Sequence, residues 1–271
     1  AASTYGSFSY LKYGPLRLFS QIAQDSNLKV GKFIWVVGHS GPETAEDSRT
    51  HFGIFAPGVT QLFPNGHIIN IHPWEHNEVA PSLSAALQTE VPIIAIHLTR
   101  PAIVIPDRNL MGISSHMDSA KGAYIIKDFE KEEKRKGVVI VRGTSATNSI
   151  IQILPKLKDK GINVKIIAAI SWELFIRQEK KYREKVISNY EWNDAMVITN
   201  GSIKLMNNWI SSMVVKKYSI SPDHDDKWRT GGSVNEIIKE SHLDPDNIFK
   251  GIEKFAKDFD KRHLLLNTNK K

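Results

Sequence analysis

Cysteine is absent from all 271 residues of the sequence. This absence excludes disulfide bonds, catalysis by a thiolate and metal sites built from thiolate ligands. It fits a cytoplasmic enzyme, which is the location we expect.

Long apolar runs are absent as well. No stretch approaches the roughly 20 residues that a helix needs to cross a bilayer, so the sequence predicts no membrane segment. No signal-peptide pattern opens the chain. The chain begins with "AASTYGSF" and no methionine, which fits either a processed protein or a fragment of a longer one.

The sequence lacks the concentrated positive charge that is typical of a nucleic-acid-binding protein. The net charge is +7, but residues 1–110 hold 7 Lys and Arg against 8 Asp and Glu, and the remaining residues hold 29 against 21. The excess of bases lies in segments such as "RQEKKYREK", where acids alternate with bases. Such alternation is typical of a solvated surface, so we expect no nucleic-acid partner.

The sequence has enough apolar residues for a globular core. Hydrophobic residues make up 41% and charged residues 24%, and the length suits one large or two ordinary domains. Short β-branched runs alternate with helical patterns, which predicts an α/β fold. The expected strands are 33–38, 67–72, 92–97, 138–142, 164–170, 195–199 and 213–216, and the expected helices are about 15–25, 77–89, 143–161, 171–187, 232–240 and 245–257. We predict two domains, joined near residues 108–136, each with a mainly parallel sheet flanked by helices.

One polar loop, "GHSGPETAEDSRTHFG" at residues 38–53, directly follows an expected strand. In open α/β sheets, ligands bind in the crevice at the carboxyl ends of the strands. The loop contains His39 and His51, with Glu43, Glu46 and Asp47 between them. From residue types alone, a loop histidine is more often solvated or structural than catalytic, so the residues by themselves leave both interpretations open.

Four stretches of the sequence resemble the transketolase family. "GHSGPETAEDSRTH" is similar to the family's T-H-D-S-I-G-x-G-E-D-G-P-T-H, with the first His, the E-D pair and the closing T-H at unchanged spacing. "TYGSFSYLKYGPLRL" looks like T-F-x-x-F-x-x-Y-x-x-G-x-x-R, and "VPIIAIHLTR" is similar to P-x-x-x-A-L-S-R, with one residue more between Pro and Arg. "AAISWELFIRQEKKYREKVI" is close to S-M-P-S-W-E-L-F-x-x-Q-x-x-x-Y-R-x-x-V.

The resemblance covers nearly the whole chain but only the carboxyl-terminal part of a transketolase. It implies a pyrimidine-binding domain at residues 1–125, lacking its start, and a C-terminal α/β domain at residues 126–271. The activity it implies is transfer of a two-carbon ketol unit between sugar phosphates with thiamine diphosphate as cofactor. A divalent metal, Mg or Ca, would lie in the diphosphate domain that has no counterpart here. The resemblance also implies a homodimer, and we expect this segment alone to be inactive.

The same resemblance assigns roles to particular residues. Tyr5 and Phe8 would bind the cofactor by walling its aminopyrimidine ring, because a flat heteroaromatic ring stacks well on other rings. His51 would move a proton or hydrogen bond at the reacting carbonyl, and Asp47 would accept a hydrogen bond from the α-hydroxyl of the substrate. His39 and Arg100 would bind the phosphate of the acceptor sugar.

Some residues depart from the family pattern. Ser48 and Arg49 replace the Gly-Pro before the closing T-H, and Leu11 stands at the third aromatic position. These departures favour an alternative, a non-catalytic transketolase-like partner or assembly subunit. Another thiamine family, such as deoxyxylulose-phosphate synthase, is a further alternative, and the "SWELFIRQEKKYRE" match weighs against it.

Two other motifs have weaker functional interpretations. "NIHPWEHNE" contains His72, Glu75, His76 and Glu78, which are metal-ligand types. Because Pro73 disfavours a helical turn through His72, an ordinary strand-to-helix turn is the preferred interpretation and no metal site is predicted. Two glycines in "RTGGSVNEI" precede an expected helix, where we favour a capped turn over an anion site.

Overall fold

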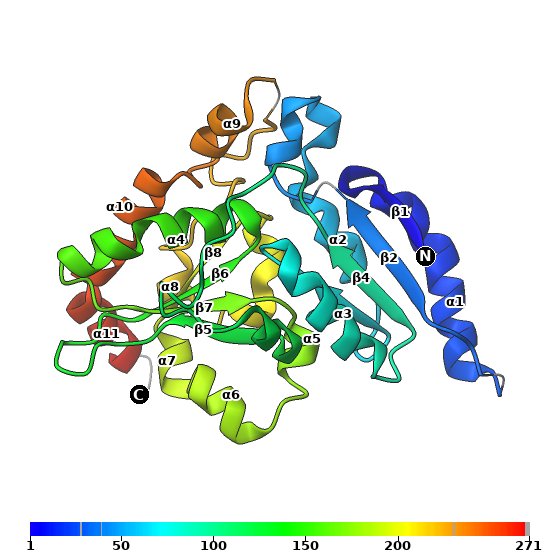
Figure 1. The fold of residues 1–271 in the computed structure, drawn as a ribbon, viewed down its shortest axis with the longest axis horizontal. Helices are drawn as coiled ribbons and strands as arrows, with labels where there is room; N and C mark the ends of the chain where they lie inside the picture. The colour runs from blue at the N-terminus through cyan, green and yellow to red at the C-terminus, as the bar shows by residue number, and fades with distance from the viewer. Residues whose placement is uncertain (28, 39, 230, 269–271) are drawn as a thin grey trace.

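The computed structural model describes residues 1–27, 29–38, 40–229 and 231–268. It contains two four-stranded sheets (Figure 1), which confirms the α/β fold predicted from the sequence. Within the described ranges, no helix combines the length and apolar character that crossing a membrane requires.

The first sheet is entirely parallel, with strand order β1-β2-β4-β3. Its strands are β1 (Ala2–Tyr5), β2 (Phe33–Gly38), β3 (Ile68–Ile71) and β4 (Ile93–His97). The residues of β3 and β4 are all buried, as expected for parallel strands that are covered on both faces.

The second sheet is mixed, with strand order β5-β7-β6-β8. Its strands are β5 (Ala123–Lys127), β6 (Val138–Arg142), β7 (Lys165–Ala169) and β8 (Ala195–Thr199). Strands β6, β7 and β8 are parallel, whereas β5 is antiparallel to β7. The two-domain division at residue 125 stays a prediction; β5 crosses that position and pairs within the second sheet.

Helices connect the strands and cover both sheets. The α-helices are α1 (Tyr13–Asp25), α2 (Ala56–Thr60), α3 (Val79–Leu87), α4 (Thr144–Asp159), α5 (Trp172–Phe175), α6 (Lys180–Val186), α7 (Asn189–Asn193), α8 (Met213–Lys216), α9 (Val234–Glu240), α10 (Pro245–Lys257) and α11 (Phe259–Thr268). The 3-10 helices are η1 (Gly6–Lys12), η2 (Glu43–Glu46), η3 (Arg49–His51), η4 (Gly53–Phe55), η5 (His76–Glu78), η6 (His116–Lys121) and η7 (Ile203–Trp209).

The two sheets share one large hydrophobic core. The largest cluster of buried residues includes Ile69 and Ile94 from the first sheet and Val139 and Ile166 from the second. Helix α3 lies between the sheets (Figure 1) and contributes Ala86 to this core. The sheets are therefore held together by apolar packing as well as by the chain that connects them.

Two expectations about secondary structure were wrong. Residues 213–216 form helix α8 rather than a strand, because Ser212 accepts a hydrogen bond from the Val214 amide and caps a helical turn. The place beside β8 is taken instead by Ile220, which bridges to Ile198. The single helix expected over 171–187 is interrupted, since α5 and α6 are separate helices.

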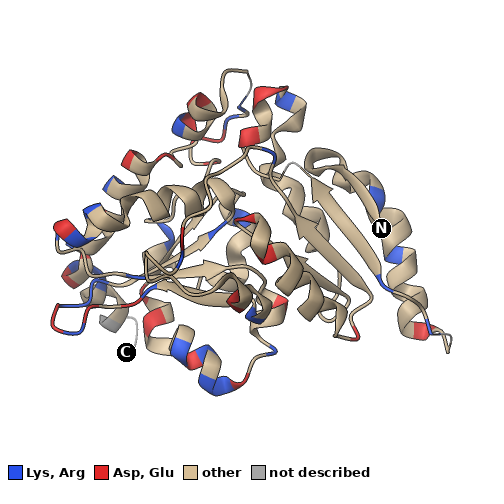
Figure 2. Cartoon of the chain, viewed as in Figure 1, with Lys and Arg blue, Asp and Glu red and all other residues tan. Residues whose placement is uncertain are grey.

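The charged surface of the fold is mixed in sign. Figure 2 shows basic and acidic residues interleaved along α6 and its neighbours, as the sequence of that segment requires. The exposed ion pair between Lys180 and Glu184 on this helix is an example, at 3.7 Å. Such pairs contribute little to stability because solvent screens them.

Candidate active site

The candidate site lies at the carboxyl edge of the first sheet. Strands β1, β2 and β4 are neighbours and parallel, so the residues that follow them meet at the same edge. Tyr5 ends β1, the 40–55 loop (residues 40–55) follows β2, and Arg100 comes shortly after β4. Segments that are far apart in the sequence thus converge at one place.

The charged residues of the site form a compact group. Arg100 donates to the carboxylates of both Asp47 and Glu46. His51 Nδ1 lies 3.6 Å from Asp47 Oδ2, which is too long for a hydrogen bond. Each of these four side chains is between 21% and 35% exposed, so the group is accessible from solvent.

Aromatic rings pack against the histidine of this group. The ring of Tyr5 stacks on His51 with centroids 4.3 Å apart, and Phe8 meets His51 edge-on at 6.0 Å. Tyr5 and Phe8 contact each other in a T-shaped arrangement at 6.3 Å. The five candidate residues that the structure describes therefore lie together, whereas His39 lies outside the described residues.

Hydrogen bonds fix the loop that carries Asp47 and His51. The Ser40 amide donates to Leu98 O at 2.7 Å, and the Gly53 amide donates to Gly41 O at 3.0 Å. Gly41 has a φ of 118°, a backbone conformation that favours glycine. The loop is thus closed at its base.

A cavity of about 390 Å³ lies beside the candidate residues. Its lining includes Arg49, Phe52, Phe55 and Trp228. Trp228 comes from the second half of the chain and packs edge-on against both phenylalanines, at 5.9 and 5.5 Å. No sequence pattern indicated this contact, because Trp228 is distant in the chain and follows no recognised motif.

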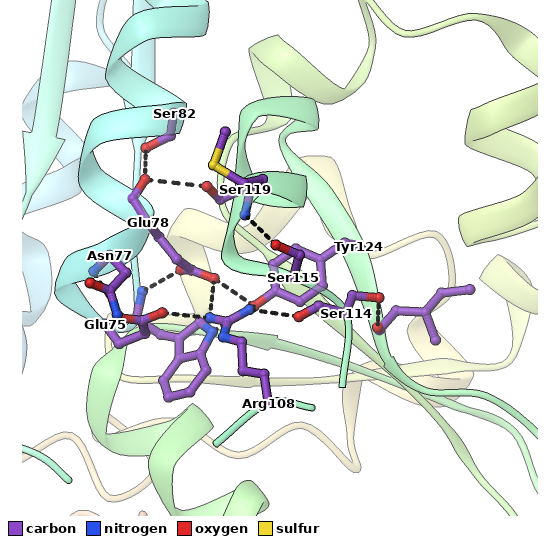
Figure 3. Close-up of polar contacts among 12 residues, drawn as sticks. Glu75, Asn77, Glu78, Ser82, Arg108, Ser114, Ser115, Ser119 and Tyr124 are labelled. Atoms are coloured by element: carbon purple, nitrogen blue, oxygen red, sulfur yellow. Dashed lines mark hydrogen bonds and ion pairs between the residues drawn. The ribbon is translucent and has the colours of Figure 1, made fainter. Parts of the chain in front are cut away.

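The "NIHPWEHNE" motif forms a buried salt-bridge cluster (Figure 3). Arg108 Nη2 donates to Glu75 Oε1 at 2.8 Å and to Glu78 Oε1 at 2.9 Å. The Tyr124 hydroxyl donates to Glu78 at 2.5 Å, and the Trp74 indole donates to Tyr124 at 2.7 Å. The cluster connects the start of α3, the segment before β5, and β5 itself.

The residues of that motif do not converge as metal ligands. The carboxylates of Glu75 and Glu78 face Arg108, His72 is buried elsewhere and His76 is exposed. Among the described residues, no group of three or more histidines and carboxylates could hold a metal ion.

A second polar cluster, missed in the sequence, is buried between the two sheets. The rings of His72 and His97 stack 4.2 Å apart, and His97 Nε2 lies 3.2 Å from Asn70 Oδ1. Burial lowers the pKa of His97 to about 3 and the pKa of Arg142 to about 10. Both histidines are therefore neutral near pH 7, since the pKa of His72 is also lowered well below its ordinary value by burial.

Comparison with known proteins finds similarity to transketolases. Residues 122–223 match a family described as the transketolase-like TK C-terminal domain. Transketolase 7 of Craterostigma plantagineum is 29% identical over 164 residues, which cover 60% of this chain and 23% of the relative. The chloroplastic transketolase of Solanum tuberosum is 30% identical over 164 residues, covering 60% of this chain and 21% of the relative.

Solved structures with the same fold extend over almost the whole chain. Transketolase from Leishmania mexicana superposes with a TM-score of 0.70 at 18% identity, covering 95% of this chain and 34% of that one. A Pichia stipitis transketolase complex with sedoheptulose-7-phosphate gives a TM-score of 0.69 at 18% identity, covering 96% and 34%. The chain thus spans about a third of the length of these structures, and it is similar to the carboxyl-terminal portion of transketolases.

Proposed function

We propose that this chain is part of a transketolase that transfers a two-carbon ketol unit between sugar phosphates. The observation that carries the proposal is the convergence of Tyr5, Phe8, Asp47, His51 and Arg100 at one sheet edge. These residues come from three segments that only a parallel sheet brings together. A cytoplasmic location and a second subunit in a homodimer are part of the same proposal.

The aromatic residues fit the cofactor that this activity requires. Tyr5 is 37% and Phe8 42% exposed, so both side chains are partly accessible to a flat heteroaromatic group. They would hold the aminopyrimidine of thiamine diphosphate, which when bound supplies the carbanion chemistry at the ketose carbonyl. The diphosphate and its divalent metal, Mg or Ca, would be held by the diphosphate domain of a full-length enzyme.

His51 and Asp47 would handle protons and hydroxyl groups of the sugar. An imidazole can donate or accept a proton near neutral pH, which suits a group beside a reacting carbonyl. Packing between Tyr5 and Phe8 fixes the orientation of the His51 ring. The Asp47 carboxylate is an acceptor for a substrate hydroxyl and would favour sugars that carry this group.

Arg100 would bind the substrate phosphate, together with His39. A guanidinium offers paired donors that match phosphate oxygens. In the structure these donors contact Glu46 and Asp47, so a phosphate would share or replace the carboxylates. The pairing of Arg100 with the two carboxylates also favours the alternative of a non-catalytic subunit. It neutralises the guanidinium that would bind the phosphate and the Asp47 carboxylate that would bind the hydroxyl.

The test is a ketol-transfer assay of the complete gene product with thiamine diphosphate and Mg²⁺. We expect His51→Asn to lower kcat/KM by about a hundredfold or more, a usual loss for a proton-transfer group. Asp47→Asn should lower it by about tenfold or more, because a hydrogen bond to a charged acceptor contributes about 1.5–3 kcal/mol. The matched controls are His76→Asn and Asp159→Asn, which change exposed residues outside the site. Wild-type turnover in both site variants would show that His51 and Asp47 do not have the proposed roles. A wild-type protein that folds but shows no turnover would favour the non-catalytic alternative.

A further inference from the structure

The cavity of about 390 Å³ beside the candidate residues is lined mainly by four aromatic rings, those of Tyr10, Phe52, Phe55 and Trp228, and is called the aromatic cavity below. Its size lies within the range of small-molecule sites in proteins, about 300–1,000 Å³. None of the described residues to which a role in binding cofactor, sugar or phosphate is assigned above belongs to its lining. The proposed function therefore leaves this cavity without a ligand.

Contacts between the two halves of the chain hold the rings of the aromatic cavity in place. The Tyr10 hydroxyl donates to Phe55 O at 3.2 Å. Phe52 is 3% exposed and belongs to a buried cluster that includes Ile237 of α9. Trp228 meets the rings of Phe52 and Phe55 edge-on. The walls are therefore formed by the fold itself and do not need a ligand to assemble them.

The rings at the opening of the cavity leave apolar surface in contact with water. Trp228 is 60% exposed and Tyr10 is 50% exposed. Apolar surface gathered beside one cavity is typical of a binding site, and aromatic walls favour a flat ring that packs edge-on or offset against them. A sugar would exchange hydrogen bonds to water for contacts with apolar walls, which is unfavourable for its hydroxyl groups. The lining therefore favours an aromatic ligand over a sugar.

Arg49 adds a positive charge to the lining. It begins η3, is exposed, and its guanidinium forms no hydrogen bond or ion pair with the residues that the structure describes. Glu46 and Asp47, the nearest acids before it in the loop, are instead bound by Arg100. An exposed arginine is ordinarily only solvated, but Arg49 stands at the edge of an aromatic cavity with its donors unused. A guanidinium presents paired donors that match phosphate oxygens.

We propose that the aromatic cavity binds a flat aromatic ring that carries a phosphate group, with the ring against Trp228 and Tyr10 and the phosphate on Arg49. A phosphate is favoured over a carboxylate because it carries close to two negative charges at pH 7, which strengthens its attraction to a guanidinium that solvent partly screens. Arg49 and His51 belong to the same 3-10 turn, so the bound ligand lies against the loop of the candidate site. The proposal concerns binding and does not depend on ketol transfer.

The test is a calorimetric titration of the complete gene product with phenyl phosphate as the probe. Inorganic phosphate and phenol are the comparison ligands, since each carries one half of the probe. We expect phenyl phosphate to bind at least tenfold tighter than either of them, because the ring and the anionic group each contribute contacts. Binding of phenyl phosphate no tighter than that of inorganic phosphate would overturn the proposal.

Variants locate the binding in the aromatic cavity. Arg49→Gln should raise the Kd for phenyl phosphate at least tenfold, since it removes the cation, and Arg49→Lys should recover part of this loss because it restores the charge without the paired donors. Trp228→Leu should raise the same Kd at least threefold and leave the Kd for inorganic phosphate unchanged. The matched controls Arg17→Gln and Tyr190→Leu change an exposed cation and an exposed ring outside the cavity and should stay within twofold of wild type.

Two results would refute the assignment of this ligand. A wild-type Kd for phenyl phosphate in Arg49→Gln would show that the probe binds elsewhere. Fructose 6-phosphate, titrated in parallel, should bind Trp228→Leu and wild type equally, and a loss as large as that of phenyl phosphate would show that the cavity takes sugars instead. If the wild-type protein shows no ketol transfer, the proposed function fails, whereas these titrations still decide whether the cavity binds an aromatic phosphate.

Discussion

Replacing Arg108 with methionine tests the buried cluster that links the two sheets. The Arg108 side chain is 8% exposed, and its partners Glu75 and Glu78 are 0% exposed. Methionine keeps the apolar stem but leaves two carboxylates without their cation. Removing one partner of a buried ion pair costs about 3–5 kcal/mol, because the remaining charge is buried and uncompensated.

This loss can be read as a change in melting temperature. For a chain of this size, about 2 °C per kcal/mol gives a drop of about 6–10 °C in Arg108→Met, followed by circular dichroism at pH 7. The drop should be smaller at pH 5, since protonation removes the uncompensated charge. Arg17→Met, which changes an exposed arginine on α1, should melt within 2 °C of wild type, about the shift expected for a loss under 1 kcal/mol.

A double variant separates the ion pair from simple loss of packing. The double variant Arg108→Met with Glu78→Gln should lose less melting temperature than the two single variants lose together, because the effects of contacting residues are coupled. Strictly additive losses, or a melting temperature for Arg108→Met equal to that of wild type, would refute the reasoning.

Two further predictions concern the same region. Burial raises the pKa of Glu78 from 4.5 to about 7. The favourable contribution of Glu78 to the free energy of unfolding is therefore complete below pH 4.5 and is lost as pH rises through 7. A pKa shift of this size corresponds to about 3 kcal/mol in the free energy of unfolding. Glu78→Gln should abolish this part of the pH dependence, as measured by urea unfolding between pH 5 and 7. A pH profile equal to that of wild type would contradict the prediction. Gly122 has a φ of 83°, and an added Cβ would lie 2.3 Å from both Phe175 N and Ser171 O, so Gly122→Ala should lower the melting temperature by more than about 5 °C. Gly112→Ala, at a φ of 64° with open space around it, should cost only the backbone term of about 1 kcal/mol, and equal losses in the two variants would count against the steric argument.

The fold class was predictable because buried runs and turn signals are local features. The bounds of β2, β6, β8 and α10 agree with those expected from the sequence. The strand expected at 213–216 was wrong because a serine cap outweighed the preference of two adjacent valines. Strand β5 was not predicted, since its pairing with β7 depends on a partner more than thirty residues away.

The candidate site was predicted from motif spacing, and its roles remain predictions. The spacing of His51 and Asp47 and the place of Arg100 after a strand were visible in the sequence. Their contacts with one another required the strand order β1-β2-β4. Glu46 was seen only as half of an E-D pair, and nothing in the sequence indicated that it binds Arg100.

The sequence by itself determined the strands β2, β3, β4, β6, β7 and β8, the loop that follows β2 and the residue types which that loop presents, because these depend on neighbours along the chain. Only the tertiary structure decided that Glu43 is buried and that Arg108 lies between Glu75 and Glu78. A charged residue in a polar loop looks the same in sequence whether it is solvated or buried. Whether such a residue is solvated or buried depends on the partner that the packing of the two sheets places beside it.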